Sequence, residues 1–258
     1  MKIESEHLRL NEIKWNKWAK SYDSQGLFQN RLRQAQSNVV SLLDIKENIN
    51  FLDIGCGTGY AIGEIAKLID WKGEFYGVDL SSIMIKKAKS NFGDKHNFHF
   101  IKANAESIPL NDNFFDIIIC TNSFHHYLNP DKALKEIHRL LKEGGKIYIL
   151  DPTSDKWIVK VYDKIVKLFE PEHVKIYSTS EFQQLYKNAR LKYINSKKIE
   201  FTKQNFLNRY LIIHIAEKKI IQLAKNKNAY NQQLNLTASF GSDLMLFSAL
   251  RFSSSIVV

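Results

Sequence analysis

The sequence predicts an α/β fold in which a mostly parallel sheet carries helices on both faces. Short apolar runs alternate along the chain with segments whose apolar residues recur at helical spacing, and one such run leads into a glycine-rich loop. This alternation is typical of parallel strands joined by right-handed helical crossovers. Because ligands of such sheets bind beyond the carboxyl ends of the strands, we expect the functional site there.

The chain is organised around residues 50–60, which read NFLDIGCGTGY. The apolar run over residues 51–54 contains one acidic residue, Asp53, and three glycines follow at alternate positions. Residues 61–69 are apolar at a helical period, so the loop joins a strand to a helix. A glycine loop in this position lets the backbone approach a ligand closely, with the first N–H groups of the helix pointing at it.

The spacing of the glycines argues against two common ligands. A dinucleotide-binding loop has the pattern G-x-G-x-x-G, and its third glycine, counted from Gly55, is replaced here by Tyr60. No Gly-Lys-Ser/Thr follows, as a phosphate-binding P-loop requires. The acidic Asp53 favours a cationic group, such as an amine or a sulfonium. A second acidic residue, Asp79, ends the next apolar run, where a carboxylate can accept hydrogen bonds from both hydroxyls of a ribose.

Other elements are marked by their periodicity and their caps. Residues 31–47 have the apolar pattern of a helix, and residues 98–101 that of a third strand. Ser81 is placed to cap a helix that runs through Ser90. We read His96 and His99 as surface histidines.

The next helix has both a start and a stop signal. Asn129 is expected as its N-cap and Pro130 as its first residue, while Gly144 and Gly145 are expected to end it before a strand over residues 146–150. The polar residues that fall at the carboxyl ends of the predicted strands are Asp53, Asp79, Asn104, Thr121 and Asp151.

An aromatic-rich segment interrupts the alternation after the fifth strand. Residues 153–177 precede the next helix, and an insertion there hangs over the sheet edge at which ligands bind, so we expect it to cap the substrate. Ser178 and Glu181 predict a capping box for a helix over residues 181–189. Residues 191–201 and 210–216 are expected to form the last two strands.

The composition favours one domain with additions at its ends. The 258 residues suffice for one α/β domain with a substantial core. The net charge of +10 and the pI near 9.4 come from lysines scattered through helices, which is typical of a solvated surface and leaves a functional basic patch open. Cys56 and Cys120 have no metal-binding or disulfide spacing, and no apolar run approaches a membrane span, so we expect a reduced, cytoplasmic chain.

In order along the chain, these motifs resemble those of the class I S-adenosylmethionine-dependent methyltransferases. The first motif of that family is similar to LDIGCGTG at 52–59, its ribose-binding motif to YGVDLS at 76–81, and its adenine-binding motif to ANAESIPL at 103–110. The fourth and fifth strands resemble residues 114–130 and 139–152. The resemblance covers roughly residues 15–219 and is greatest to the small-molecule branch that includes the ubiquinone and menaquinone biosynthesis enzymes.

The resemblance implies a Rossmann-like fold with a seven-stranded sheet, an antiparallel hairpin at its edge, and S-adenosyl-L-methionine as cofactor. Asp79 is then expected to bind the ribose, and Gly55 and Gly57 the amino-acid part of the cofactor. That branch usually has an aspartate where this chain has Asn104, whose oxygen can still accept a hydrogen bond from the adenine amino group. The other expected cofactor-binding residues are Tyr22, Asp53, Leu80, Ala105, Glu106 and Thr121.

The expected parts of the chain follow from the same resemblance. They are a helical lid over residues 1–47, a methyltransferase domain over residues 48–219 that includes a substrate cap at 153–178, and a C-terminal extension over residues 220–258 to which no function is assigned.

Methyl transfer from a sulfonium is an in-line displacement, so the main task of such an enzyme is to align the nucleophile, the methyl group and the sulfur. A general base is needed only if the acceptor is protonated. His126, directly after the fourth strand, is the candidate base, ahead of its neighbour His125. We therefore expect a methyltransferase that acts on a small organic acceptor.

Other functions stay open. The basic charge allows an RNA-directed methyltransferase, and the same fold could bind S-adenosylmethionine without catalysis, although the acidic pair Asp53 and Asp79 argues against a dead cofactor site. A nicotinamide dehydrogenase is disfavoured because Tyr60 replaces the third glycine of a dinucleotide-binding loop. Methylation of nucleic-acid amino groups is disfavoured because residues 122–125 read NSFH and lack the two prolines of that motif, and Cys120 does not follow a proline, as the nucleophile of C5-methylating enzymes usually does.

Overall fold

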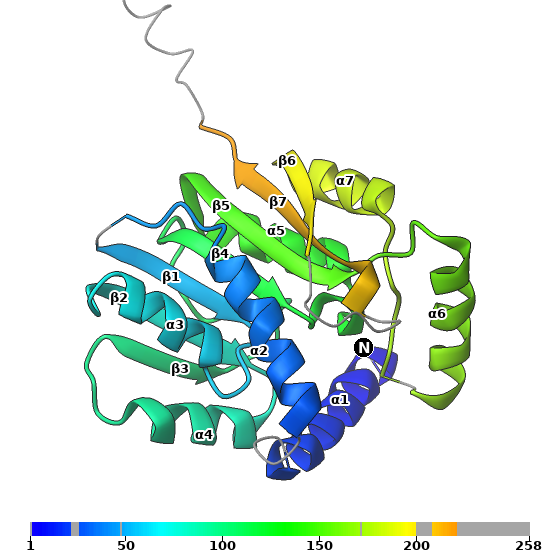
Figure 1. Ribbon diagram of the computed structural model, residues 1–258, viewed down its shortest axis with the longest axis horizontal. Helices are drawn as coiled ribbons and strands as arrows, with labels where there is room; N and C mark the ends of the chain where they lie inside the picture. Colours follow the sequence, from blue (N-terminus) through cyan, green and yellow to red (C-terminus); the bar gives the residue numbers. More distant parts are fainter. Residues whose placement is uncertain (1, 22–25, 47, 171, 200–207, 221–258) are drawn as a thin grey trace, which may run out of the picture. The chain divides into compact units, whose positions relative to one another are not determined.

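A seven-stranded sheet in the order β3-β2-β1-β4-β5-β7-β6 forms the centre of the protein (Figure 1). The computed structural model describes residues 2–21, 26–46, 48–170, 172–199 and 208–220. Strands β1 to β5 are parallel to one another, while β7 is antiparallel to both β5 and β6. The strands are β1 Ile49–Ile54, β2 Gly73–Asp79, β3 Phe98–Lys102, β4 Phe115–Thr121, β5 Leu141–Pro152, β6 Leu191–Lys198 and β7 Leu211–Lys218.

Each face of the sheet carries its own hydrophobic core, because side chains of a strand alternate between the two faces. In β1, Phe51 packs into one core and Leu52 into the other, and in β4 Ile117 and Ile118 are divided in the same way. Helices α2 and α3, seen in front of the sheet in Figure 1, contribute to the first core, and α5 and α7 to the second. The helices are α1 Lys2–Ser21, α2 Gly26–Val40, α3 Tyr60–Leu68, α4 Ser82–Phe92, α5 Pro130–Leu140, α6 Trp157–Phe169 and α7 Thr179–Asn188, with short 3-10 turns η2 Phe124–His126 and η3 Asn208–Tyr210.

The predicted fold class and most predicted caps are confirmed. Ser81 is the N-cap of α4 and accepts a hydrogen bond from the Met84 N–H at 3.1 Å. Ser178 and Glu181 form the expected capping box at the start of α7. None of the described helices is long and apolar enough to cross a membrane.

The end of α5 differs from the prediction. The helix stops at Leu140, and β5 begins at Leu141, so the Gly144–Gly145 pair lies inside a strand and does not terminate the helix. The pairing of β4 with β5 shifts register between Phe115 and Ile117, and the glycines occupy the resulting irregularity. Glycine suits a bulge as well as a helix end, and the sequence pattern does not separate the two.

Two other boundaries also differ. The helix predicted over residues 31–47 is α2, which begins five residues earlier, at Gly26, and ends at Val40. Strand β6 ends at Lys198, and residues 200–201 of the predicted strand lie outside the described part of the chain. Contacts divide the chain into the units Met1–Lys219 and Ile220–Val258, and all of the second unit except Ile220 also lies outside the described residues.

Candidate active site

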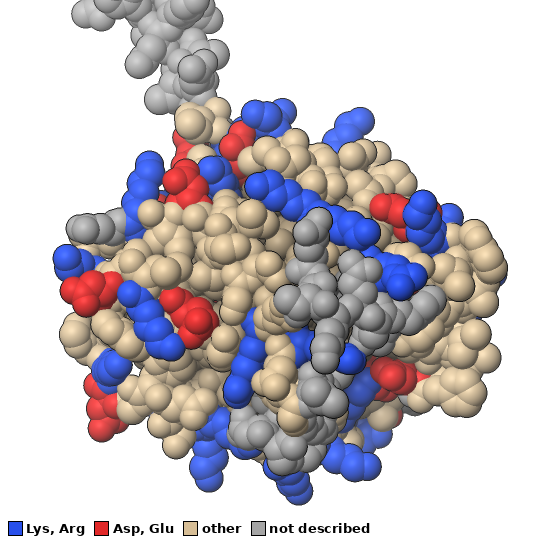
Figure 2. Space-filling view, viewed as in Figure 1, with Lys and Arg blue, Asp and Glu red and all other residues tan. Residues whose placement is uncertain are grey.

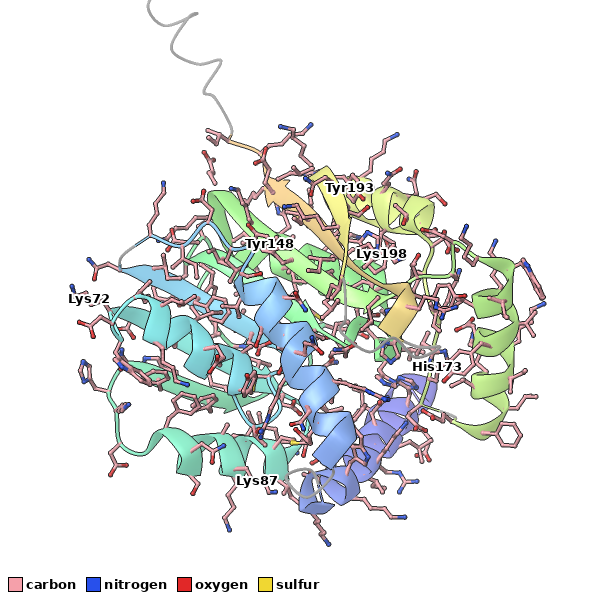
Figure 3. The ribbon with its side chains drawn as sticks, in the orientation of Figure 1. Lys72, Lys87, Tyr148, His173, Tyr193 and Lys198 are labelled. Atoms are coloured by element: carbon pink, nitrogen blue, oxygen red, sulfur yellow. The ribbon has the colours of Figure 1, made fainter. Side chains whose placement is uncertain are left out.

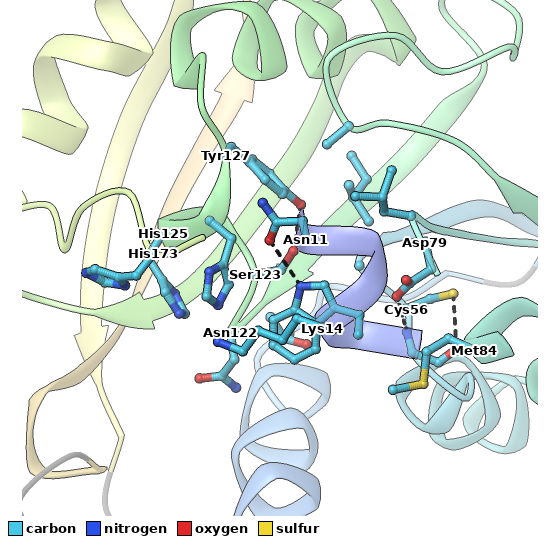
Figure 4. A pocket seen from close by; sticks show the side chains of 18 of the residues that line it. Asn11, Lys14, Cys56, Asp79, Met84, Asn122, Ser123, His125, Tyr127 and His173 are labelled. Atoms are coloured by element: carbon cyan, nitrogen blue, oxygen red, sulfur yellow. Dashed lines mark hydrogen bonds between the residues drawn. The ribbon is translucent and has the colours of Figure 1, made fainter. Parts of the chain in front are cut away.

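A cavity of about 460 Å³ opens at the carboxyl ends of β1, β2 and β4. Side chains from α1 and α2 cover it, and residues of α6 and the segment after it line one side. Figure 4 shows Asp79, Cys56 and Met84 at one end of this cavity and His125 and His173 at the other, with Asn11, Lys14 and Ser123 between them. The cavity therefore has an end at the glycine loop and an end formed by histidines.

The glycine loop after β1 needs its glycines for conformation and for space. Gly55, Gly57 and Gly59 all have positive φ, at 78°, 53° and 83°. A Cβ on Gly55 would lie 2.4 Å from the Ser123 Oγ, and a Cβ on Gly59 would lie 2.7 Å from the Phe92 ring. The loop can follow this path only without side chains, and it leads directly into α3.

Asp79 faces the cavity at the end of β2 and is held by the backbone. One carboxylate oxygen accepts a hydrogen bond from the Gly57 N–H at 2.9 Å, and the other accepts one from the Ser81 N–H at 2.8 Å. Burial raises the pKa of Asp79, and these two donors act in the opposite direction. Since a carboxylate oxygen has more than one acceptor site, both can still take a further donor from a ligand.

Asp53, near the end of β1, has no internal partner. The residue is fully buried, and neither carboxylate oxygen has a hydrogen-bond partner among the described residues. Burial first, and then the charge of Asp79, raise the pKa of Asp53 from 3.8 to about 8. A buried carboxyl without a partner just before the glycine loop is suited to a cationic ligand.

The segment after β3 uses its polar side chains internally. The Asn104 Oδ1 accepts a hydrogen bond from the Glu106 N–H at 3.1 Å. The Glu106 carboxylate accepts hydrogen bonds from the Asn129 N–H and Nδ2, at 3.0 and 2.8 Å. Asn129 is the N-cap residue of α5, as expected, although its side chain makes no capping hydrogen bond. The two hydrogen bonds between Glu106 and Asn129 hold the wall of the cavity beside Ala105 in place.

Helix α1 is tied over the cavity by specific contacts. The Asn16 Oδ1 accepts a hydrogen bond from the Ser81 Oγ at 2.7 Å, next to Asp79. Trp15 packs edge-on against Trp18 and against His126, with ring centroids 5.4 and 5.1 Å apart. Tyr22, expected to bind the cofactor, lies outside the described residues.

Three histidines gather at the other end of the cavity. His125 and Asp151 form a hydrogen bond of 2.8 Å through His125 Nδ1, and His173 Nε2 lies 2.7 Å from an Asp163 carboxylate oxygen. The His126 Nδ1 donates to the Glu172 carbonyl at 3.3 Å. Burial lowers the pKa of His125 to about 3 and that of His126 well below its usual range, so both rings are neutral near pH 7. Burial likewise raises the pKa of Asp151.

The segment predicted to cap the substrate contributes to the cavity through one face of α6. Tyr162 and Val166 line the cavity, and His173 follows on the inner side of the helix (Figure 3). Trp157, an aromatic residue of this segment, is 73% exposed and does not line the cavity.

The predicted site residues come together in this one cavity. Nine of them line it, and Asp53 lies buried behind the glycine loop. Sequence reasoning missed His173, Lys14 and Gln36, whose Nε2 donates to the Thr121 Oγ1 at 3.2 Å. No local motif marks these residues, since each reaches the cavity through a distant helix or loop. The nine predicted residues are Gly55, Gly57, Asp79, Leu80, Asn104, Ala105, Glu106, Thr121 and His126.

Sequence comparison identifies relatives of this chain. Residues 52–149 match the protein family described as a methyltransferase domain. The uncharacterized methyltransferase YcgJ of Bacillus subtilis is 28% identical over 192 residues, which are 73% of this chain and 74% of YcgJ. The ubiquinone/menaquinone biosynthesis C-methyltransferase UbiE of Shewanella sp. is 30% identical over 131 residues, or 49% of this chain, and the match spans about half, 52%, of UbiE.

Solved structures share the fold. A S-adenosylmethionine-dependent methyltransferase from Aquifex aeolicus superposes with a TM-score of 0.59 and 23% identity over 79% of this chain and 98% of its own. A putative methyltransferase from Haloferax volcanii, solved in complex with its activator Trm112, gives a TM-score of 0.70 with 18% identity over 80% of this chain; the match covers 98% of the solved chain.

Proposed function

Because the chain belongs to the class I S-adenosylmethionine-dependent methyltransferases, we propose that its cavity binds S-adenosylmethionine at the glycine-loop end and a small organic acceptor at the histidine end. The observation that carries this proposal is the position of Asp79. Its carboxylate lies at the end of β2, is held against the glycine loop by the Gly57 N–H, and faces the cavity. A carboxylate in this position can accept hydrogen bonds from both ribose hydroxyls.

The residues present fit such a cofactor. S-adenosylmethionine, when bound, supplies an activated methyl group on a sulfonium. A positive charge near the glycine loop would favour the ionised form of Asp53, whose buried carboxyl has no partner among the described residues and whose pKa is raised by burial. Gly55 and Gly57 line the cavity at this end, so their backbone is assigned to the amino-acid part.

The remaining cofactor contacts complete this assignment. Leu80 forms an apolar wall for the adenine, and the Asn104 oxygen has acceptor capacity left for its amino group. Glu106 contributes through its backbone, since its carboxylate already binds Asn129. Thr121 lies on the sulfonium side, and Tyr22 is assigned to the lid.

The acceptor end favours an aromatic, moderately apolar molecule. Trp15, Tyr162 and Val166 line this end together with the histidines. The name of the UbiE relatives describes C-methyltransferases of ubiquinone and menaquinone biosynthesis, and transfer to a ring carbon is compatible with this lining. An acceptor of this kind loses a proton during methylation.

We propose that His126 is the base that accepts the proton lost by the acceptor. The Glu172 carbonyl can only accept a hydrogen bond, so the His126 Nδ1 carries a hydrogen and Nε2 keeps a free lone pair. The ring is neutral near pH 7 and lines the cavity, as a base must.

The surface supports a small acceptor more than an RNA. On the face shown in Figure 2, lysine and arginine side chains are spread widely, and several lie next to acidic ones, as is typical of a solvated surface. A cytoplasmic location is part of the proposal, and two buried cysteines without a disulfide agree with it.

Calorimetric titration with S-adenosylhomocysteine tests the cofactor assignment, with NADH titrated in parallel. We expect saturable one-to-one binding of S-adenosylhomocysteine and none of NADH. Asp79→Ala should abolish the binding, while Glu74→Gln, at the other end of the same strand, should not change it. Equal affinity of the wild type and Asp79→Ala would contradict the assignment. A screen of aromatic acceptors with a labelled methyl donor would then identify the substrate.

A further inference from the structure

The three histidines of the cavity form a cluster that the cofactor assignment does not use. One ring nitrogen of each of His125, His126 and His173 lies within 4.8 Å of a ring nitrogen of each of the others. The residues come from η2 and from the segment after α6, and they line the same cavity (Figure 4). Histidines on a protein surface can lie close together by chance. In this cluster His126 and His173 are buried and His125 is nearly buried, so their arrangement is fixed by packing.

Hydrogen bonds fix the orientation of each ring. His173 Nε2 donates to an Asp163 oxygen that also accepts from the Ile176 N–H, so His173 Nδ1 is left with a lone pair. The Glu172 carbonyl leaves a lone pair on His126 Nε2 in the same way. The pair of His125 with Asp151 leaves one on His125 Nε2 when the shared proton lies on Nδ1. Metal-binding histidines characteristically have the second nitrogen held by a carboxylate or a carbonyl.

The surrounding charge favours a cation. Asp151 and Asp163 bind the rings directly, and Glu170 and Glu172 lie beside them. Lys14 is the cation that faces the cluster in the described part of the chain, and it is paired with Glu170 at 2.6 Å and with Glu172. Carboxyl groups therefore outnumber cations around the three rings.

We propose that His125, His126 and His173 bind a divalent transition metal ion of the zinc class at the acceptor end of the cavity. Three neutral imidazoles with a fourth position open to a cavity are a ligand set of catalytic zinc sites. Nitrogens of tetrahedral zinc lie about 3.4 Å apart at Zn–N distances of about 2.0–2.1 Å, so binding draws the rings together. The open position takes an oxygen or nitrogen of the acceptor. While the metal is bound, His126 is a ligand and not a free base.

Zinc titration of the full chain, freed of tags and metal, tests the site. We expect one Zn²⁺ per chain, and Co²⁺ should give the visible absorption of a four-coordinate site. His173→Ala and His125→Ala should each weaken Zn²⁺ binding by about tenfold or more, while His96→Ala, an exposed histidine outside the cluster, should not.

S-adenosylhomocysteine binding separates this proposal from the cofactor assignment, on which it does not depend. Both cluster variants should bind S-adenosylhomocysteine like the wild type, which also shows that they fold. No Zn²⁺ or Co²⁺ binding by the wild type, or equal Zn²⁺ affinity in the wild type and in either cluster variant, would overturn the proposal. If one variant does not fold, the other decides.

A separate observation concerns the outer face of α6. Six apolar side chains of this helix are between 37% and 79% exposed, and they fall on one continuous arc of the helix, away from the inward residues Val159, Tyr162 and Val166. Over α6, at the right-hand edge of Figure 2, the surface carries few charges. The six exposed residues, called here the α6 outer face, are Trp157, Ile158, Val161, Ile165, Leu168 and Phe169.

Basic residues adjoin this face. Lys160, Lys164 and Lys167 occupy the next arc of the helix and are exposed, and Lys156 precedes it. The one acidic residue of α6, Asp163, points inward to His173. A helix with Trp, Leu and Phe on one face and lysines beside it is typical of binding in the interface of a membrane with anionic lipids.

We infer that the α6 outer face docks on an anionic membrane surface. The inner face of the same helix lines the acceptor end of the cavity, so docking brings that end to the lipid. Charge complementarity selects this occupant over an apolar protein surface, which would not need the lysines.

Sedimentation of the full chain with vesicles tests the docking. We expect binding to phosphatidylcholine vesicles that contain phosphatidylglycerol, and weaker binding without the anionic lipid or at high salt. A variant with Trp157→Ser, Leu168→Ser and Phe169→Ser should bind at least about tenfold more weakly, and Leu68→Ser, also exposed, should not. Equal vesicle binding by the triple variant would overturn the inference. The inference would also be overturned if the wild-type protein does not bind vesicles and instead forms dimers that the triple variant does not form.

Discussion

The hydroxyl of Ser81 donates a hydrogen bond to the Asn16 Oδ1 at 2.7 Å and accepts one from the Met84 N–H at 3.1 Å. One buried side chain therefore caps α4, holds α1 over the cavity and stands next to Asp79. The stability of the domain and the closure of the cavity are coupled at this residue.

Ser81→Ala should lower both stability and cofactor affinity. Loss of an N-cap costs about 0.5–2 kcal/mol of the free energy of unfolding, and the loss of the Asn16 contact loosens α1. Denaturant unfolding and S-adenosylhomocysteine titration measure the two effects. Ser178→Ala, which removes the cap of α7 away from the cavity, should lose similar stability and keep its affinity. A loss of affinity in both variants would refute the coupling.

Gly55→Ala should destabilise the protein more than Gly93→Ala. Both residues have positive φ, where a side chain costs about 1–2 kcal/mol. At Gly55 the new Cβ also meets the Ser123 Oγ at 2.4 Å, whereas nothing lies within 4 Å of a Cβ on Gly93. The difference in the free energy of unfolding between the two variants measures the cost of the close contact between the new Cβ and Ser123. Equal losses would show that Ser123 moves away at no cost.

Asp53→Asn should stabilise the cofactor-free protein increasingly as the pH rises. The pKa of Asp53 is raised from 3.8 to about 8 in the folded state, so between these values the folded protein binds a proton that the unfolded chain has lost. Wild-type stability therefore falls from about pH 4 to pH 8 through this group. The variant lacks the penalty, so its advantage in melting temperature should be small at pH 4 and largest near pH 9. An advantage of the variant that is constant over this range would contradict the assignment. Asp94→Asn, a change of the same kind at an exposed residue, is the matched control.

Val166→Trp should impair turnover of the acceptor and leave S-adenosylhomocysteine binding unchanged. Val166 lines the cavity from the inner face of α6, so a larger side chain there takes space from the acceptor. Trp157→Ala, on the outer face, should change neither quantity in a vesicle-free assay. Steady-state kinetics with the identified acceptor measures the effect, and a normal KM and kcat for Val166→Trp would place the acceptor elsewhere.

The sequence by itself determined the order of the elements and the edge of the sheet at which most of the predicted site residues meet. Apolar alternation in β1 and β4 and the helical stripe of α5 are local patterns, and each corresponds to an element that is buried as expected. Because β1, β2 and β4 are parallel, their carboxyl ends meet at one edge, which brings Asp79 and Thr121 to one cavity although they are far apart in the chain.

Only the tertiary structure decided which side chains are partners across the cavity. His173 meets His125 because α6 and the segment after it fold back over the sheet edge, and no local spacing records that path. The same packing turns Trp157 outward and Val166 inward, although both belong to one apolar helix. Local periodicity specifies that a face is apolar, whereas the surface that covers it depends on contacts between residues distant in sequence, which a local pattern does not contain.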